Sequence, residues 1–423
     1  MKKETLIRVL EGIVVGCLAG LTAVFYRLSL TWAESGLFWV LNQIRQRPVY
    51  IAAWFLVLIG LAYLVAWMVR WEGMASGSGI PQVCGEAEGK LETCWWRVIT
   101  AKFVGGTLSI LGGLSLGREG PSIQLGAMAA KGYARVRHVD AKREREFLCC
   151  GAGAGLAAAF NAPLAGILFV LEEICHGFDH TIVMMGVVAT VTADFVSKLF
   201  FGQAAIFHYS SETLPLSDYW VLVVFGVILG LAGAGYNAVM LKVQGIFQSM
   251  KKVPLAVRIM IPFVLAGILG LTFPRVLAGG HEMVELLESQ RPTLLMLALL
   301  LVIKFLFSSI SFGSGAPGGI FFPLLILGSY LGAIYGTVVL SVLPIPDGMW
   351  EQFIILGMAG LFAGIVRAPL TGIVLITEMS GSMHRMIDIA LVSIVAHIVA
   401  NVTGSKPIYT SLLENILKRQ KKE

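Results

Sequence analysis

The strongest constraint on the fold of this chain is an internal repeat. Residues 151–172 (GAGAGLAAAFNAPLAGILFVLE) align without a gap on residues 357–378 (GMAGLFAGIVRAPLTGIVLITE). A second match lies upstream, where residues 102–126 align on residues 304–328 through shared Lys, Phe, Gly, Pro and Leu positions. The chain is therefore predicted to consist of two homologous halves, and sites of chemistry are expected where the halves meet.

The composition indicates that the halves lie in a membrane. Hydrophobic residues make up 57% of the chain and charged residues only 14%, which fits a protein surrounded mostly by lipid. The 48 glycines and 15 prolines fall inside apolar stretches, where they predict helices that stop partway or pack closely. We expect an all-α polytopic membrane protein with many tilted and discontinuous helices.

The placement of basic residues predicts the orientation of the two halves. Six Lys and Arg residues lie between residues 128 and 147, and the matching stretch 330–353 has none. Cytoplasmic loops carry more basic residues than external ones, so the first stretch is predicted inside and its counterpart outside. The two repeats should then have inverted topology. Basic residues at both ends of the chain place both termini in the cytoplasm, although basic tails on any solvated face would predict the same location.

We predict a single transmembrane domain over residues 1–423. Repeat one covers about residues 10–205, repeat two covers about residues 218–404, and residues 405–423 form a C-terminal helix with a short basic tail. No segment resembles a nucleic-acid-binding module, and we expect neither a nucleic-acid partner nor a cofactor.

Two carboxylates are not shared by the repeats. Glu119 aligns with Phe321, and Glu173 aligns with Met379, so the fold of a half does not require an acid at either position. A charged group at the bilayer centre costs about 2.5 to 3.5 kcal/mol, which marks such acids as functional candidates. The alternative for Glu119 is an acid in the first turn of a helix. Glu172 recurs in the second repeat and is interpreted as structural.

Three short Gly- and Pro-containing motifs stand at predicted helix starts within apolar surroundings. Glycine allows close backbone approach, and proline suits the first turn of a helix, so each motif would direct free N–H groups at one place. Several helix N-termini meeting in this way form an anion site without a fixed cation. Each motif alone marks only a turn, and Ser78 alone could be a helix cap. The motif residues are Gly77, Ser78, Gly79, Ile80 and Pro81; Gly117, Arg118, Glu119, Gly120 and Pro121; and Gly319, Ile320, Phe321, Phe322 and Pro323.

Taken together and in this order, these motifs resemble those of the CLC family of chloride channels and chloride/proton antiporters. The resemblance covers about residues 10–415 and includes the final piece GSKPIY, which ends at Tyr409. It implies a secondary active antiporter that exchanges chloride for protons, with the C-terminal helix lining the pore. It also implies that the chain is not an enzyme.

The resemblance implies a role for each site residue. Ser78 and Tyr409 would donate hydroxyl hydrogen bonds to the central chloride, and Ile320 and Phe321 would donate backbone amides. Glu119 would be the external gate that competes with chloride and exchanges protons with the outside. Glu173 would receive protons from the cytoplasm. The glycines and prolines of the motifs, with Arg118, form the backbone of the filter. Tyr409 alone would more often be an interfacial aromatic residue.

Three alternatives remain open on the sequence. The first is a passive chloride channel gated by Glu119, which Glu173 disfavours because a channel needs no second buried acid. The second is an antiporter for fluoride or nitrate; Ser78 favours chloride within this family. The third is an intramembrane enzyme, but no base or metal set lies beside a nucleophile.

The cysteines and histidines give no metal pattern. All six cysteines lie in the first half and are interpreted as buried apolar thiols. Glu173 and His176 have the spacing of one ligand pair of a di-iron site, but such a site needs a second pair and the sequence has none. We predict no metal.

The resemblance further implies a homodimer with one pore per subunit. Its contacts would come from apolar helices near residues 180–205 and 385–404. Because the chain ends at Glu423 without a C-terminal nucleotide-binding regulatory domain, we expect a multi-pass protein of a prokaryotic plasma (inner) membrane.

Overall fold

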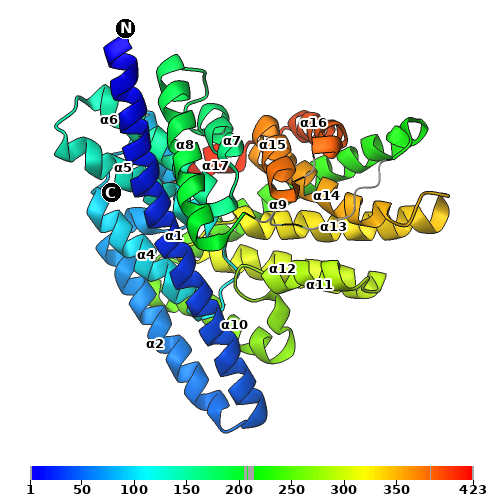
Figure 1. The fold of residues 1–423 in the computed structure, drawn as a ribbon. Coiled ribbons are helices and arrows are strands. Elements are labelled where there is room, and N and C mark those ends of the chain that lie inside the picture. Colours follow the sequence, from blue (N-terminus) through cyan, green and yellow to red (C-terminus); the bar gives the residue numbers. More distant parts are fainter. Residues whose placement is uncertain (1, 204–206, 208–213, 382, 422–423) are drawn as a thin grey trace. The chain divides into compact units, whose positions relative to one another are not determined.

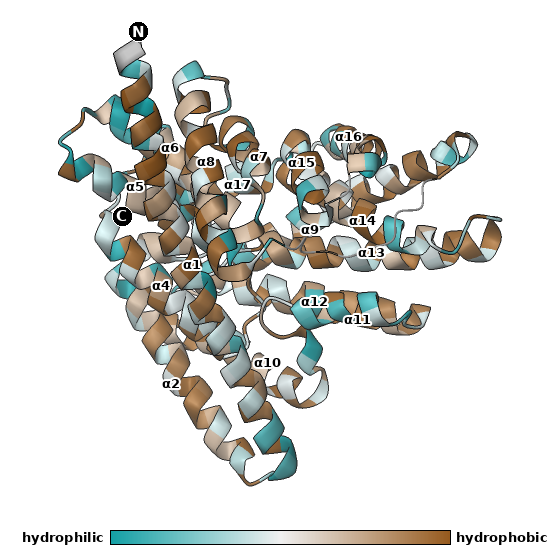
Figure 2. Ribbon diagram, viewed as in Figure 1, coloured by the Kyte–Doolittle hydropathy of each residue, from teal (hydrophilic) through white to brown (hydrophobic). Residues whose placement is uncertain are grey.

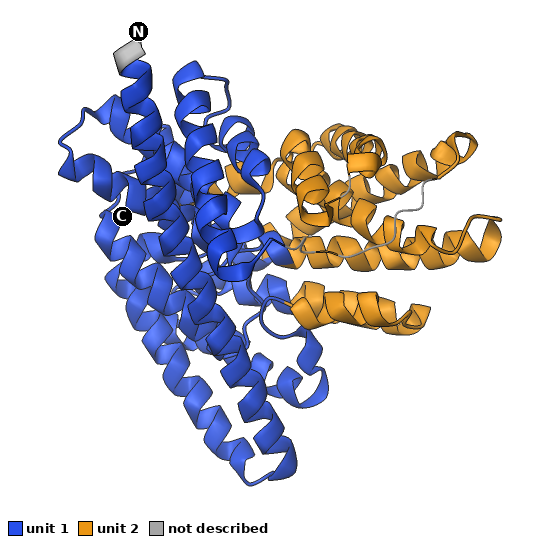
Figure 3. Cartoon of the chain, in the orientation of Figure 1, with its two compact units in different colours: residues 1–203, 243–279, 307–322 blue, residues 204–242, 280–306, 323–423 orange. Residues whose placement is uncertain are grey.

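The computed structural model of this chain describes residues 2–203, 207, 214–381 and 383–421. The predicted repeat boundary near residue 205 and the last two residues of the basic tail lie outside this part. The described chain forms two compact units, shown in Figure 3. Unit 1 comprises residues 1–203, 243–279 and 307–322, and unit 2 comprises residues 204–242, 280–306 and 323–423.

Helices make up both units, and no β-strand occurs among the described residues beyond one isolated bridge (Figure 1). Unit 1 contains α1 (Lys2–Gln46), α2 (Tyr50–Trp71), α3 (Ile80–Ala87), α4 (Trp95–Leu111), α5 (Glu119–Val136), α6 (Ala141–Phe160), α7 (Pro163–Phe169), α8 (His180–Phe201) and α10 (Leu255–Thr272). Unit 2 contains α11 (His281–Ser289), α14 (Met349–Val366), α15 (Pro369–Ser380), α16 (Met386–Val402) and α17 (Ile408–Gln420). Three helices have residues in both units: α9 (Tyr219–Ser249), α12 (Leu294–Gly313) and α13 (Phe321–Val342).

Five single-turn helices punctuate the long ones. They are η1 (Gly73–Ala75), η2 (Val170–Ile174), η3 (Leu216–Asp218), η4 (Pro274–Val276) and η5 (Met383–Arg385). η2 is a π-helix, a wide turn that is rare and often found at functional sites.

The helices are apolar enough to cross a membrane. Nine helices in the described part of the chain have the length and hydropathy of a membrane span, among them α2, α8, α13 and α16. Figure 2 shows hydrophobic residues along these helices and hydrophilic ones gathered mainly at helix ends and loops. Large apolar side chains such as Trp67 on α2 and Phe195 on α8 are exposed on the chain, as expected where lipid is the solvent.

The sequence repeat reappears as the same close helix crossing in each unit. In unit 1, α5 crosses α6 where Gly126 and Gly151 leave no room for a side chain, because an added Cβ on either would collide with the backbone of the other. In unit 2, α13 crosses α14 in the same way at their repeat counterparts, Gly328 and Gly357. Small residues at these crossings let two helix backbones approach closely.

The breaks that follow these crossings are also repeated. Asn161 ends α6 in a left-handed conformation with φ of 53°, and its counterpart Arg367 ends α14 with φ of 74°. Two residues later, Pro163 and Pro369 start α7 and α15. The apolar run 147–171 is therefore two helices, in agreement with the expectation that some helices stop partway.

The interior of unit 1 contains small side chains where α1 packs on α6 and α8. Val15, Ala19, Ala154, Ala158 and Ala189 are fully or almost fully buried there. At one end of this interior, charged residues join α6 to α1: the guanidinium of Arg143 donates to both carboxylate oxygens of Glu11 at 2.8 and 2.7 Å. That end carries the basic stretch 128–147.

Candidate functional site

Three glycine-containing loops of unit 1 are held together by backbone hydrogen bonds. The N–H of Gly117 donates to the carbonyl of Gly319 at 2.6 Å, and the N–H of Gly319 donates to the carbonyl of Gly117 at 2.8 Å. The carbonyl oxygen of Gly77 accepts from the N–H of Gly318 at 3.0 Å and from Nζ of Lys102 at 2.8 Å. The three motifs found in the sequence therefore meet in space, although they lie up to about 240 residues apart.

Ser78 points its hydroxyl at the start of α5. The side chain is only 2% exposed, and its Oγ has no hydrogen-bond partner among the described residues. Gly120 lies directly against it, because a Cβ added there would collide with Oγ of Ser78. A buried hydroxyl without a partner is costly unless a ligand accepts its hydrogen bond.

Glu119 is the first residue of α5 and is completely buried. Within the described structure neither carboxylate oxygen has a partner in hydrogen-bond geometry, and Nε of Arg118 lies 3.7 Å from Oε1. Backbone N–H groups approach the carboxylate from its own first turn and from Phe322, at the start of α13. The negative charge thus lies where helix N-termini favour an anion.

Ile320 is the last residue of the loop before α13 and Phe321 is the first residue of that helix; both are buried, with exposures of 1% and 0%. The ring of Phe321 packs against Phe160 and Phe169, with ring centroids 5.2 and 6.3 Å away. These aromatic contacts fix the backbone of the loop at the beginning of the helix. Pro323, the last residue of the motif, belongs to unit 2.

Tyr409 lies in unit 2, in the first turn of α17, and is 1% exposed. The loop before it is anchored by side chains. Nδ2 of Asn237 donates to the carbonyl of Lys406 at 3.1 Å, and Nη2 of Arg367 donates to the carbonyl of Ser405 at 3.0 Å. The tyrosine therefore projects from a fixed helix start. Of the predicted chloride ligands, Ser78, Ile320 and Phe321 belong to unit 1 and only Tyr409 to unit 2.

Glu173 lies in the π-helix η2 of unit 1 and is 4% exposed, while its neighbour Glu172 is partly exposed. The thiol of Cys84, on α3, donates to the carbonyl oxygen of Glu173 at 3.6 Å. The i to i−5 bond from the amide of Cys175 to the carbonyl of Val170, at 2.8 Å, closes the wide turn. A buried carboxylate on such a turn is a proton-carrier candidate.

Two further residues, Lys102 and Gln124, support the site. Lys102 is fully buried and binds the Gly77 carbonyl, which agrees with a structural role suggested by its recurrence as Lys304. Gln124 is also fully buried, donates to the carbonyl of Met74 at 2.9 Å and packs against Gly79. The repeat gives one signal for Gln124, which aligns with the apolar Ile326, but its partners Met74 and Gly79 follow only from the fold.

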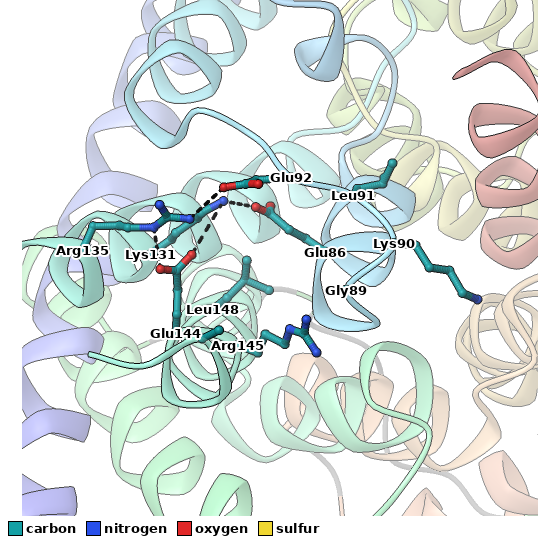
Figure 4. A pocket seen from close by; sticks show the side chains of 11 residues that line it. Glu86, Gly89, Lys90, Leu91, Glu92, Lys131, Arg135, Glu144, Arg145 and Leu148 are labelled. Atoms are coloured by element: carbon teal, nitrogen blue, oxygen red, sulfur yellow. Dashed lines mark hydrogen bonds and ion pairs between the residues drawn. The ribbon is translucent and has the colours of Figure 1, made fainter. Parts of the chain in front are cut away.

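A pocket of about 340 Å³ in unit 1 is lined mainly by charged residues, some buried and some exposed (Figure 4). Lys131, 2% exposed, is ion-paired with Glu86 and donates to the carbonyl of Thr93 at 2.8 Å. Nε of Arg135 lies 2.5 Å from Oε2 of Glu144. The sequence predicts Lys131 in an exposed basic loop, whereas the structure buries it in an ion pair on α5. The Lys131–Glu86 pair joins α5 to α3, which starts beside Ser78, and the Arg135–Glu144 pair joins α5 to α6.

The helices and the three joined loops define a class of protein, a polytopic α-helical membrane protein built from two repeats. The family model for the voltage gated chloride channel matches residues 60–401, and the chain belongs to this family. The resemblance found in the sequence and the predicted all-α fold class are therefore confirmed.

Individual relatives give the same assignment. The chain is 33% identical to the H(+)/Cl(-) exchange transporter ClcA of Klebsiella pneumoniae (strain 342), over 100% of this chain and 91% of that protein. It is 35% identical to the transporter of the same name from Vibrio vulnificus (strain YJ016), over 96% and 89%. A crystal structure of a slow cyanobacterial Cl-/H+ antiporter matches with a TM-score of 0.93 at 30% identity, covering 98% of this chain and 99% of that one. A CLC-type fluoride/proton antiporter, at 23% identity and a TM-score of 0.79, shares the fold.

Proposed function

We propose that this protein is a secondary active antiporter that moves chloride across the membrane in exchange for protons. The observation that carries the proposal is the position of the buried Glu119 carboxylate at the start of α5, beside the Phe322 amide and with no hydrogen-bond partner in the described chain. Because the Glu119 carboxylate lies where a free anion could bind, the carboxylate and the anion cannot occupy that position together. The identity to curated H(+)/Cl(-) exchange transporters supports the same function.

Chloride binding would use dipoles instead of a fixed cation. Burying a bare monovalent ion costs on the order of 20 kcal/mol in a medium of low dielectric constant, and partial charges must offset that cost. The unpartnered hydroxyl of Ser78, the amides of Ile320 and Phe321, and the hydroxyl of Tyr409 are the proposed donors. Dipoles hold the ion strongly enough to enter and weakly enough to leave.

Coupling to protons would follow from the chemistry of Glu119. While it is ionised, the carboxylate occupies the anion position and repels chloride. When a proton neutralises it, the carboxyl group no longer competes for the helix N-termini, and chloride can take the position. Each exchange of carboxylate for chloride therefore binds or releases one proton on the external side.

Glu173 would supply the proton on the internal side. It is buried on the wide turn η2, and the adjoining residues 176–180 are exposed. A passive channel gated by Glu119 alone has no use for a second buried acid. Glu173 therefore favours the antiporter over the channel.

We further propose that both termini are cytoplasmic, that the protein resides in the inner membrane of a bacterium, and that it forms a homodimer with one pore per subunit. The basic stretch 128–147 supports the orientation. Exposed apolar side chains on α8, such as Phe195 and Leu199, and on α16, such as Ile394 and Ile398, support contacts with lipid or a second copy.

The test is a flux measurement on purified protein in liposomes. An outward chloride gradient at equal pH on both sides should drive protons inward against their own gradient as it builds up. Protein-free liposomes give the background proton uptake, and a proton ionophore shows that an accumulated proton gradient can be dissipated. Chloride movement without uphill proton movement would make the protein a passive channel, and coupling that appears only with fluoride or nitrate would change the anion.

A further inference from the structure

The sulfur atoms of two cysteines are in contact near Glu173, the proposed internal proton carrier. Sγ of Cys149, on α6, lies 3.2 Å from Sγ of Cys175, which follows Glu173 by two residues. Both are free thiols in this structure. A disulfide has a sulfur–sulfur distance of about 2.05 Å, so an approach of about 1.2 Å would join them. Neither thiol has a part in the proposed transport.

The fold does not require this pair. The repeat counterparts of Cys149 and Cys175 are Ile355 and Gly381, so the corresponding helices α14 and α15 of the second half form without any thiol. The two cysteines also differ in access, since Cys149 is 2% exposed whereas Cys175 is partly exposed. Residues 176–180, which follow Cys175, are exposed and give a small oxidant a route to it.

We propose that Cys149 and Cys175 are a modification site, at which hydrogen peroxide forms a reversible disulfide that slows proton transfer through Glu173. The effect on transport rests on the proposed function. The formation of the bond does not, because it depends only on the two sulfurs.

The chemistry balances with one peroxide per disulfide. The Cys175 thiolate attacks one peroxide oxygen, the O–O bond breaks, and hydroxide leaves and takes up the proton that Cys175 released, giving a sulfenic acid and water. The Cys149 sulfur then attacks the sulfenic sulfur, the S–O bond breaks, and the hydroxyl leaves with the Cys149 proton as a second water. Two thiols lose two electrons, and peroxide gains them. Cys175 is the sulfur that peroxide reaches first, because it is partly exposed whereas Cys149 is buried.

The bond would act on Glu173 through the backbone of η2. The amide of Cys175 bonds the carbonyl of Val170 across the wide turn, and the thiol of Cys84 holds the carbonyl of Glu173 from α3. Pulling residue 175 toward α6 would therefore shift or stiffen the turn that carries the carboxylate. Proton exchange at a buried carboxylate depends on its geometry toward water, so a fixed turn would slow it.

The first experiment counts thiols. Purified protein in detergent is treated with hydrogen peroxide, unreacted thiols are alkylated, and peptides are identified by mass spectrometry. Wild type should fall from six alkylatable thiols to four, with one disulfide peptide that joins Cys149 to Cys175, and dithiothreitol should restore all six. C149S and C175S should each lack the disulfide, whereas C84A and C150A should retain it. Absence of the linked peptide in wild type, or its replacement by another pairing, would overturn the proposal.

The second experiment measures proton and chloride flux in liposomes before and after peroxide. Wild type should lose most of its coupled proton flux on oxidation and regain it with dithiothreitol, while C149S and C149A should keep their flux throughout. A disulfide that forms without any loss of flux would overturn the proposed regulation. If reduced wild type showed no coupled flux at all, the proposed function would fail instead, and the thiol count would still report on the bond.

Discussion

Gly117 and Gly319 exchange both of their backbone hydrogen bonds, with N···O distances of 2.6 and 2.8 Å. Each glycine leads into a long helix, α5 or α13, so this short bridge sets two helix N-termini next to one another. The same two loops bring the Phe322 amide close to the Glu119 carboxylate. The repeat thus supplies one loop from each half to a single place, and each helix start contributes part of a positive dipole.

Chloride binding should depend on the absence of a side chain at Gly120, where the Ser78 hydroxyl lies. An alanine there would put its Cβ onto Oγ of Ser78 and 2.9 Å from the Ser78 carbonyl oxygen. The Ser78 hydroxyl would have to move away from the ion, and a hydrogen bond to a charged group contributes about 1.5 to 3 kcal/mol, so Gly120→Ala should weaken chloride binding about tenfold in a calorimetric titration. Gly73→Ala is the matched control, because nothing lies within 4 Å of the added carbon. Equal affinities in the two variants would contradict the role of Ser78.

Neutralising the external gate should separate chloride flux from proton flux. Glu119→Ala removes the carboxylate, and Glu119→Gln keeps its shape without its charge, so neither can carry a proton. Both variants should transport chloride at or above the wild-type rate and show no uphill proton movement in the liposome assay. Proton pumping that survives in both would rule out Glu119 as the coupling group.

Glu173 should be needed for protons but not for chloride. Glu173→Ala and Glu173→Gln should abolish proton movement with chloride flux retained, because the buried internal carrier is lost. Glu172→Gln serves as the control, since Glu172 recurs as Glu378 in the second repeat and is partly exposed. The assignment fails if Glu172→Gln loses proton flux while the Glu173 variants keep it.

The hydroxyl of Tyr409 should contribute to chloride affinity. Tyr409→Phe removes one donor and keeps the buried ring, and hydrogen bonds to charged groups contribute about 1.5 to 3 kcal/mol, so binding should weaken about tenfold or more. Tyr335→Phe is the control in the same unit, because that hydroxyl donates to the carbonyl of Val221 at 2.7 Å. Isothermal titration with chloride gives the comparison, and an unchanged affinity for Tyr409→Phe would remove this residue from the site.

The thermal stability of the protein should depend on Arg367, which donates hydrogen bonds to carbonyl groups at the ends of two helices of unit 2. Its side chain is 8% exposed and donates to the carbonyls of Gly364 at 2.9 Å, Ala400 at 2.6 Å and Ser405 at 3.0 Å. A buried carbonyl left without a donor costs about 1 to 3 kcal/mol. Arg367→Leu should therefore lower the melting temperature in detergent clearly.

Two companions sharpen this measurement. Arg367→Lys should recover part of the loss, because an ammonium group can still reach some of the carbonyls. Arg291→Gln should change little, since that side chain is half exposed and both its 4.0 Å ion pair and its 2.8 Å hydrogen bond with Asp347 are open to solvent. A melting temperature for Arg367→Leu equal to that of Arg291→Gln would contradict the anchoring role.

Basic residues illustrate where sequence reasoning reached its limit. Lys102 could be interpreted as structural because it recurs at the same place in both repeats, and it does bind the Gly77 carbonyl. The basic neighbours of Lys131 in the sequence predict an exposed loop for it. Its burial against Glu86 depends on how α5 packs on α3, and hydropathy patterns carry no information on such packing.

The sequence by itself determined that this chain is a membrane protein of two repeats, that it belongs to a known family, and which acids have no repeat counterpart. Those conclusions rest on composition, alignment and motif spacing, which are properties of the linear chain. Only the tertiary structure decided that Gly117 meets Gly319, that Gly120 leaves room for the Ser78 hydroxyl, and that Cys149 lies against Cys175. Such contacts join residues far apart in sequence through helix packing and backbone geometry, and no periodicity along the chain specifies them.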